Sequence, residues 1–143
     1  MALVEQVVTG PAVPAQLDAL HAALDRLWAE IEAMTDPQPS TEQRMAFATG
    51  VIEIASNILR HAYPSSASVG DIEIRLELHA NRLEALLTDC GQPFTEPRPD
   101  SLVEPQDLPE SGLGLALARR SLDTVEYERN ASGRNQWRLT KYL

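Results

Sequence analysis

The sequence predicts an α/β (α+β) two-layer sandwich, in which a mixed, mainly antiparallel sheet carries helices on one face. Several short segments alternate between apolar and charged residues, as strands do when one face is buried and the other is wet. Longer segments repeat their apolar residues at the spacing of a helix with one apolar stripe. Elements that are apolar on one side bury those sides against one another, and a helical layer packed on a sheet achieves this.

The first part of the chain predicts one strand followed by two helices. Residues 3–8 are typical of a short strand, and Pro14 opens a helix in which leucines recur at helical spacing. The segment T-D-P-Q-P-S ends that helix. A second helix begins at Thr41 and ends at Tyr63, because Pro64 disfavours a helical residue before it.

The rest of the chain predicts two hairpins separated by a loop and a helix. The alternating segment D-I-E-I-R-L-E-L-H turns through N-R into a second strand at 83–88. Residues 93–109 contain five of the ten prolines and predict a loop, after which S-G-L-G-L opens a helix. The segments T-V-E-Y-E-R and N-Q-W-R-L-T-K-Y-L, joined by a turn at A-S-G-R, predict the last hairpin.

Length and composition limit the functions open to the chain. Its 143 residues, 43% of them hydrophobic, predict one domain over residues 1–143. The formal charge of −9 argues against nucleic acid as a partner, because a phosphate-backbone binder needs a basic face. No apolar run is long enough for a membrane span, and the N-terminus lacks the pattern of a signal peptide. We therefore expect a cytoplasmic protein with no membrane partner.

Several common kinds of site are excluded by the residues themselves. Lys141 is the only lysine, and no glycine-rich loop precedes it, so the phosphate-binding loop G-x-x-x-x-G-K-[ST] is absent. The segment G-L-G-L-A-L departs from the dinucleotide pattern, because Leu117 replaces the third glycine. The three histidines have no zinc-ligand spacing, and no G-x-S-x-G motif occurs.

Three polar residues recur at a spacing of four within the apolar helical segment E-I-A-S-N-I-L-R-H-A-Y. Positions four apart drift by only about 40° around a helix, so Glu53, Asn57 and His61 share one ridge, with Gly50 beside it. A solvated polar face would explain this ridge without any function.

Two glycine-containing segments add a possible nucleotide site. In D-C-G-Q-P-F, ionised Asp89 can only accept hydrogen bonds, and Gly91 lets a flat group approach the backbone, which suits an adenine with its amino group. In S-G-L-G-L, Gly112 and Gly114 stand at a helix N-terminus, which favours a phosphate. Taken alone, the first segment is more typical of a turn after a strand, and the second is often only a hinge or a helix cap. Their joint occurrence in this order favours the nucleotide.

These segments together resemble the Bergerat-type ATPase fold shared by DNA gyrase B, the ninety-kilodalton heat-shock chaperone, sensor histidine kinases and the mismatch-repair ATPase. More narrowly, the chain is similar to the free-standing bacterial anti-sigma factors that double as serine/threonine kinases. E-I-A-S-N-I-L-R-H-A-Y resembles their N box, D-C-G-Q-P-F the first glycine box, S-G-L-G-L-A-L-A-R-R the second, and N-Q-W-R-L-T-K the terminal strand.

The resemblance implies a role for each matching residue. Asn57 would bind Mg²⁺, Glu53 would be the catalytic base and Asp89 would hold the adenine of ATP. The other residues implied to bind or shape the nucleotide site are Arg60, His61, Gly91, Gly112, Leu113, Gly114 and Leu115. The chain departs from the family in two places: residues 95–110 are acidic with Arg98 as their one cation, and Arg138 replaces a threonine that is common in the last strand.

The function that the resemblance implies is an ATP-dependent serine/threonine kinase that phosphorylates an antagonist protein and sequesters a sigma factor, with a homodimer as the expected assembly. The alternative is an ATP-gated switch that binds a protein without kinase activity, which the acidic segment 95–110 favours because it adds repulsion near the triphosphate. A sensor histidine kinase would need a further helical domain with a phosphoacceptor histidine. We expect ATP to be preferred over GTP, because guanine has a carbonyl oxygen where adenine has its amino group.

Overall fold

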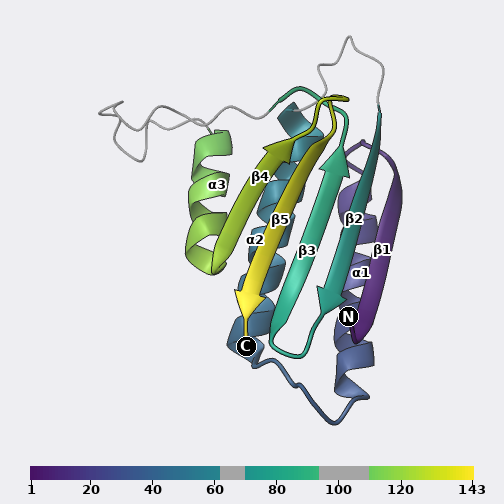
Figure 1. Cartoon of the computed structure of the whole chain (residues 1–143), viewed down its shortest axis with the longest axis vertical. Coiled ribbons are helices and arrows are strands. Elements are labelled where there is room, and N and C mark those ends of the chain that lie inside the picture. Colours follow the sequence, from purple (N-terminus) through teal and green to yellow (C-terminus); the bar gives the residue numbers. More distant parts are fainter. Residues whose placement is uncertain (62–69, 94–109) are drawn as a thin grey trace.

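Five strands of the described chain form one sheet in the order β1-β2-β3-β5-β4, and three helices cover one of its faces (Figure 1). The computed structural model describes residues 1–61, 70–93 and 110–143, without the side chains of residues 61 and 110–113. The strands are β1 Val4–Pro11, β2 Asp71–Leu78, β3 Arg82–Asp89, β4 Thr124–Arg129 and β5 Asn135–Tyr142. The helices are α1 Gln16–Glu32, α2 Thr41–His61 and α3 Glu110–Ser121.

All four strand pairings in the described sheet are antiparallel. β2 pairs with β3 and β4 pairs with β5, which confirms both predicted hairpins. β3 then pairs with β5, so the last strand lies at the centre of the C-terminal half of the sheet. The predicted two-layer fold is confirmed, and the parallel pairing that a mixed sheet would contain is absent from these five strands.

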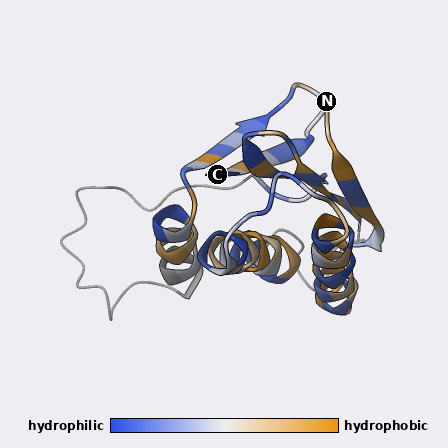
Figure 2. Ribbon diagram, turned by 90° about the horizontal axis from the view of Figure 1, so that it is seen from below, coloured by the Kyte–Doolittle hydropathy of each residue, from blue (hydrophilic) through white to orange (hydrophobic). Residues whose placement is uncertain are grey.

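The helices lie side by side as a single layer under the sheet (Figure 2). The buried face of α1 consists of Leu20, Ala23, Leu24, Leu27 and Ile31, and its three leucines are among those predicted at helical spacing. In β2 every second residue is buried, as the alternating sequence predicts. These faces meet in one apolar core between the two layers. The core therefore fixes which side of each strand and helix faces the other layer.

Several element boundaries differ from the prediction. β1 ends at Pro11 because its pairing with β2 continues to the partner Asp71. α1 begins at Gln16, since residues 13–15 form a turn in which Val13 and Pro14 accept bonds from Gln16 and Leu17. α3 begins one residue before S-G-L-G-L. The predicted end of α2 at residue 63 lies outside the described residues, as do residues 94–109 of the loop predicted over 93–109, including Arg98.

None of the described helices covers the other face of the sheet, which is largely hydrophilic (Figure 2). Arg75 lies between Glu73, at 3.2 Å, and Glu5, at 3.5 Å. Its hydrogen bond to Glu73, followed by the charge of Glu5, raises the pKa of Arg75, which therefore stays charged. No helix in the described ranges combines the length and the apolarity that a bilayer crossing needs.

Candidate nucleotide site

Helices α2 and α3 approach each other closely at two glycines. A β-carbon built on Gly50 of α2 would lie 2.4 Å from Cδ1 of Leu122, just after α3. A β-carbon built on Gly114 of α3 would lie 2.9 Å from Oε2 of Glu53 and 3.4 Å from both Nδ2 and Oδ1 of Asn57. The second glycine segment therefore packs directly on the polar ridge of α2.

This contact gives the ridge a partner element. A purely solvated face would leave Glu53 and Asn57 without a partner element, but both are only half-exposed and both face α3. Gly114 itself is buried. Two segments separated by more than fifty residues are thus brought together, in the combination that the sequence predicts.

Asp89 ends β3 on the side of the sheet that faces the helices. It is 2% exposed and follows the buried residues Leu83, Ala85 and Leu87 at every second position. Its Oδ1 accepts a 2.7 Å hydrogen bond from the backbone N–H of Gly91. The D-C-G turn predicted from the sequence is therefore built around the carboxylate, which holds its own backbone in place.

A residue that the sequence interpretation missed, Asn135, lies opposite Asp89 in the β3–β5 ladder. Its Nδ2 donates a 3.0 Å hydrogen bond to Oδ1 of Asp89, and it is 2% exposed. Arg138, which by the resemblance replaces a threonine common in the last strand, pairs with Leu86 of β3 instead. Arg138 points to the open face, where its Nε lies 3.4 Å from Oε1 of Glu84.

The alternation of buried and exposed residues along β5 indicates that Asn135 and Arg138 lie on opposite faces of the sheet. Trp137 and Leu139 are the apolar residues of the strand and must face the core, so Asn135 shares their side and Arg138 does not. The register with β3 then places Asn135 beside Asp89. The alternation is present in the sequence. The pairing of β5 with β3, which sets Asn135 beside Asp89, is known only from the structure.

The remaining predicted residues fall into three groups. Gly91 is buried beside Asp89, and its carbonyl accepts hydrogen bonds from Asn135 and Arg129. Arg60 is exposed near the end of α2, whereas Leu115 is 4% exposed and belongs to the core. The backbones of His61, Gly112 and Leu113 are helical, and their side chains lie outside the described residues.

The two parts of the site lie at the same end of the molecule. β3 ends, α2 ends and α3 begins at that end, as Figure 1 shows. The carboxylate of Asp89 faces the helical layer from the sheet, and the ridge of α2 meets the first turns of α3. A carboxylate from β3, an amide from α2 and the N-terminus of α3 therefore lie toward the same end of the molecule.

The donor set on α2 suits a hard divalent cation. The amide oxygen of Asn57 and the carboxylate of Glu53 are oxygen ligands, which Mg²⁺ prefers, and Mg²⁺ typically needs only one or two of them besides phosphate and water. Gly114 places no side chain between these groups and an incoming phosphate. The residues present thus fit a nucleotide-bound magnesium ion.

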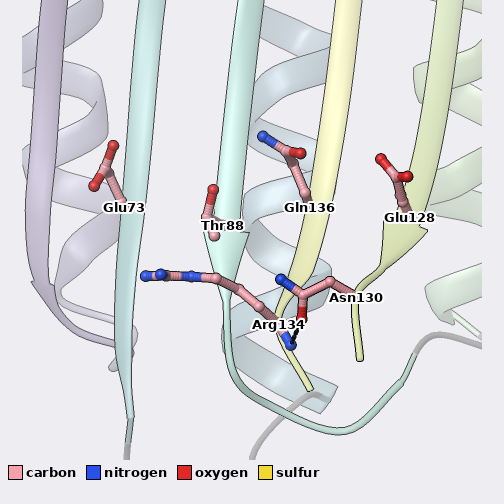
Figure 3. Close-up of a pocket in the computed structure, with 6 residues that line it drawn as sticks. All are labelled: Glu73, Thr88, Glu128, Asn130, Arg134 and Gln136. Carbon is pink, nitrogen blue, oxygen red and sulfur yellow. Dashed lines mark hydrogen bonds between the residues drawn. The ribbon is translucent and has the colours of Figure 1, made fainter. Parts of the chain in front are cut away.

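A cavity of about 300 Å³ lies elsewhere, on the open face of the sheet (Figure 3). It is lined by Glu73, Thr88, Glu128, Asn130, Arg134 and Gln136. Thr88 neighbours Asp89 in sequence but points away from the helices, so this cavity is separate from the nucleotide site. Its walls carry two carboxylates and no glycine-rich backbone, an arrangement poorly suited to a triphosphate.

Glu77, His79 and Glu84 form another polar group, with ligand atoms within 4.8 Å of one another. It lies near the β2–β3 turn, at the end of β3 opposite to Asp89. Both oxygens of Glu84 already face guanidinium groups, with Arg82 at 2.9 Å and Arg138 at 3.4 Å. Those two cations oppose a metal ion at this position.

Comparison with known proteins supports the family that the sequence resembles. The chain is 37% identical over 83 residues to a serine-protein kinase RsbW of Bacillus cereus (strain AH820), a region that covers 53% of this chain and 51% of that protein. It is 36% identical over 83 residues to the RsbW of Bacillus mycoides (strain KBAB4), with the same coverage. The chain spans about half the length of the curated relatives that it matches.

Solved structures show the same fold. The RsbU and RsbW domains of Rv1364c from Mycobacterium tuberculosis match 96% of this chain and 31% of that one, with a TM-score of 0.66 at 19% identity. The histidine kinase domain of the blue-light activated histidine kinase EL346 from Erythrobacter litoralis matches 85% of this chain and 60% of that one, with a TM-score of 0.52 at 17% identity. A family model described as the histidine kinase-like ATPase domain matches residues 13–141, and the chain belongs to that family.

Proposed function

We propose that the chain is an ATP-dependent serine/threonine-protein kinase of the anti-sigma factor type. The observation that carries this proposal is the packing of Gly114 against Glu53 and Asn57, because it unites a helix N-terminus, a candidate base and a candidate metal ligand. The relatives named serine-protein kinase RsbW support the same reaction class. The protein substrate is an antagonist protein with a serine or threonine hydroxyl, and a sigma factor is the proposed second partner.

ATP binds with its adenine at Asp89 and its phosphates at the N-terminal turns of α3. The carboxylate of Asp89 accepts a hydrogen bond from the exocyclic amino group, and Gly91 leaves the adjacent backbone open to the ring. The unsatisfied N–H groups at the start of α3 and the positive end of its dipole favour the phosphates. Asn57 would hold Mg²⁺, which neutralises phosphate charge when bound.

Glu53 is the proposed general base. The hydroxyl oxygen of the substrate forms a bond to the γ-phosphorus, the bond from that phosphorus to the β–γ bridging oxygen breaks, and ADP leaves. The hydroxyl proton passes to the Glu53 carboxylate. Because Glu53 lies one helical turn from Asn57, one rigid helix holds both groups at a fixed separation.

Replacing Glu53 with Gln tests this role, because the amide keeps the size of the carboxylate and loses its ability to accept the proton. We expect the transfer of labelled phosphate from ATP to the antagonist protein to fall by about 100-fold or more, whereas ATP·Mg²⁺ affinity stays within a few-fold. Glu42→Gln, at an exposed carboxylate in the first turn of the same helix, serves as the matched control. Transfer that survives in Glu53→Gln removes this residue from the role of base.

An ATP-gated protein-binding switch is the second candidate. The acidic composition of residues 95–110 supports it, since five acids and one arginine give a net negative charge to the segment that leads into α3 in the sequence. The same labelled-phosphate experiment separates the candidates. A wild-type protein that binds ATP·Mg²⁺ and a partner but labels no serine or threonine of that partner is a switch.

A further inference from the structure

The side chain of Asn135 is held in one orientation by partners on both sides. Its Nδ2 donates toward Oδ1 of Asp89 at 3.0 Å, and toward the carbonyl oxygens of Gly91 at 3.1 Å and Gln92 at 3.3 Å. Its Oδ1 accepts from the hydroxyl of Tyr127 at 2.5 Å and from Nη1 of Arg129 at 2.9 Å. A flipped amide would set an oxygen against three acceptors, so this network fixes the donating face toward Asp89.

The two oxygens of Asp89 therefore differ. Oδ1 accepts from the N–H of Gly91 and from Asn135, whereas Oδ2 accepts no hydrogen bond from the described residues. Oδ2 keeps some contact with solvent, because among the described residues the one side-chain atom that is both fully buried and without a hydrogen-bond partner is Nε2 of His79. The carboxylate thus offers a single open acceptor to a ligand.

The number of open acceptors distinguishes the two purines. Adenine presents one amino donor beside a ring nitrogen that only accepts. Guanine presents two neighbouring donors, N1–H and the N2 amino group, which match the two oxygens of a fully open carboxylate. A carboxylate with both oxygens available would therefore accept guanine by a two-bond contact, and one with Oδ1 occupied favours the single donor of adenine.

We propose that Asn135 is a specificity-determining residue, which occupies Oδ1 of Asp89 and thereby prevents two-bond recognition of guanine. This inference rests on the proposed nucleotide function. Asn135 acts through Asp89 and the loop that follows β3, so it is a positioning residue rather than a catalytic one. Tyr127 and Arg129, both from β4, hold the Asn135 amide in this orientation by donating hydrogen bonds to its Oδ1.

The test measures the affinities of ATP, GTP and ITP, each with Mg²⁺, for the full chain and its variants. Asn135→Ala frees a lone pair on Oδ1, and we expect the ratio of ATP affinity to GTP affinity to fall by about tenfold. ITP has the N1–H of guanine without the N2 amino group, so it should gain less affinity than GTP. Arg138→Ala, on the opposite face of β5, is the matched control and should leave all three affinities unchanged.

A second variant keeps the test valid if Asn135→Ala fails to fold, as circular dichroism would show. Tyr127→Phe removes one bond to Oδ1 of Asn135 and leaves that from Arg129, so we expect a smaller fall in the same ratio. An unchanged ratio in the folded variants overturns the role of Asn135 while ATP binding stands. Failure of the wild type to bind ATP·Mg²⁺ is the separate result that overturns the proposed function.

Discussion

At the scale of single residues, Asp89 combines a structural and a proposed binding role in its two oxygens. Oδ1 holds the turn at Gly91 and the side chain of Asn135, and Oδ2 is open to a ligand. The substitution Asp89→Asn can separate these roles, because the amide has the shape of the carboxylate but keeps only one acceptor oxygen and replaces the other with an NH₂ donor. Binding and stability should therefore respond differently to one substitution.

For Asp89→Asn we expect little change in Tm, since the amide oxygen can still accept from Gly91 and Asn135. ATP affinity should fall by about 10- to 100-fold, because a hydrogen bond to a charged acceptor is worth about 1.5–3 kcal/mol and the new amide donor faces the adenine amino group. Thermal unfolding and calorimetric titration measure the two effects. Asp71→Asn, an exposed carboxylate at the start of β2, is the control; equal ATP affinity in both variants would exclude Asp89 from base recognition.

At the scale of elements, two glycines lie where α2 and α3 meet. Gly50 packs in the core, and Gly114 lies in the candidate site. The β-carbon added by Gly50→Ala meets Cγ of Leu122 at 2.5 Å, inside the core, so the buried side chain of Leu122 must move. The β-carbon added by Gly114→Ala meets the carboxylate end of Glu53, which can swing aside. The first substitution therefore acts on stability and the second on the site.

We expect Gly50→Ala to lower the free energy of unfolding by roughly 1–3 kcal/mol through overpacking, partly offset by up to about 1 kcal/mol of helix propensity. Gly114→Ala should change it by less than about 1 kcal/mol, whereas phosphotransfer should fall by about 100-fold because the base is displaced. Urea unfolding and the labelled-phosphate assay give the two numbers. Near-normal transfer by Gly114→Ala would show that this close contact does not position Glu53.

Most elements were predictable because their apolar patterns are strong and local. The alternation in β2 and the leucine stripe of α1 each specify one element and its buried face. The boundaries were less predictable: β1 continues to Pro11 through pairing with β2, a contact between residues some sixty positions apart. Local sequence does not contain such pairings.

The candidate site was likewise predictable only where its residues stand in recognisable local segments. Glu53, Asn57, Asp89 and Gly114 stand in recognisable segments, and the structure brings Gly114 onto Glu53 and Asn57 as expected. Asn135 was missed because its importance depends on the register between β3 and β5 rather than on its neighbours in sequence. Arg138 lies three positions further along β5 than Asn135, so its side chain lies on the other face of the sheet.

At the scale of the whole molecule, the chain carries a net charge of −9 and is proposed to bind an anionic triphosphate. Long-range electrostatics therefore oppose binding, and local groups must overcome that repulsion. The positive end of α3 contributes, but a divalent cation held by Asn57 adds a larger charge at the phosphates. Affinity for ATP should accordingly depend on Mg²⁺ and on this one amide.

Calorimetric titration of ATP into the wild type and Asn57→Ala, each with Mg²⁺ and with a chelator, tests this claim most directly. Asn81→Ala, an exposed asparagine in the β2–β3 turn, is the control. We predict that Mg²⁺ strengthens ATP binding to the wild type and to the control, and that Asn57→Ala removes this dependence. A wild-type protein whose affinity for ATP is the same with and without Mg²⁺ would contradict the account.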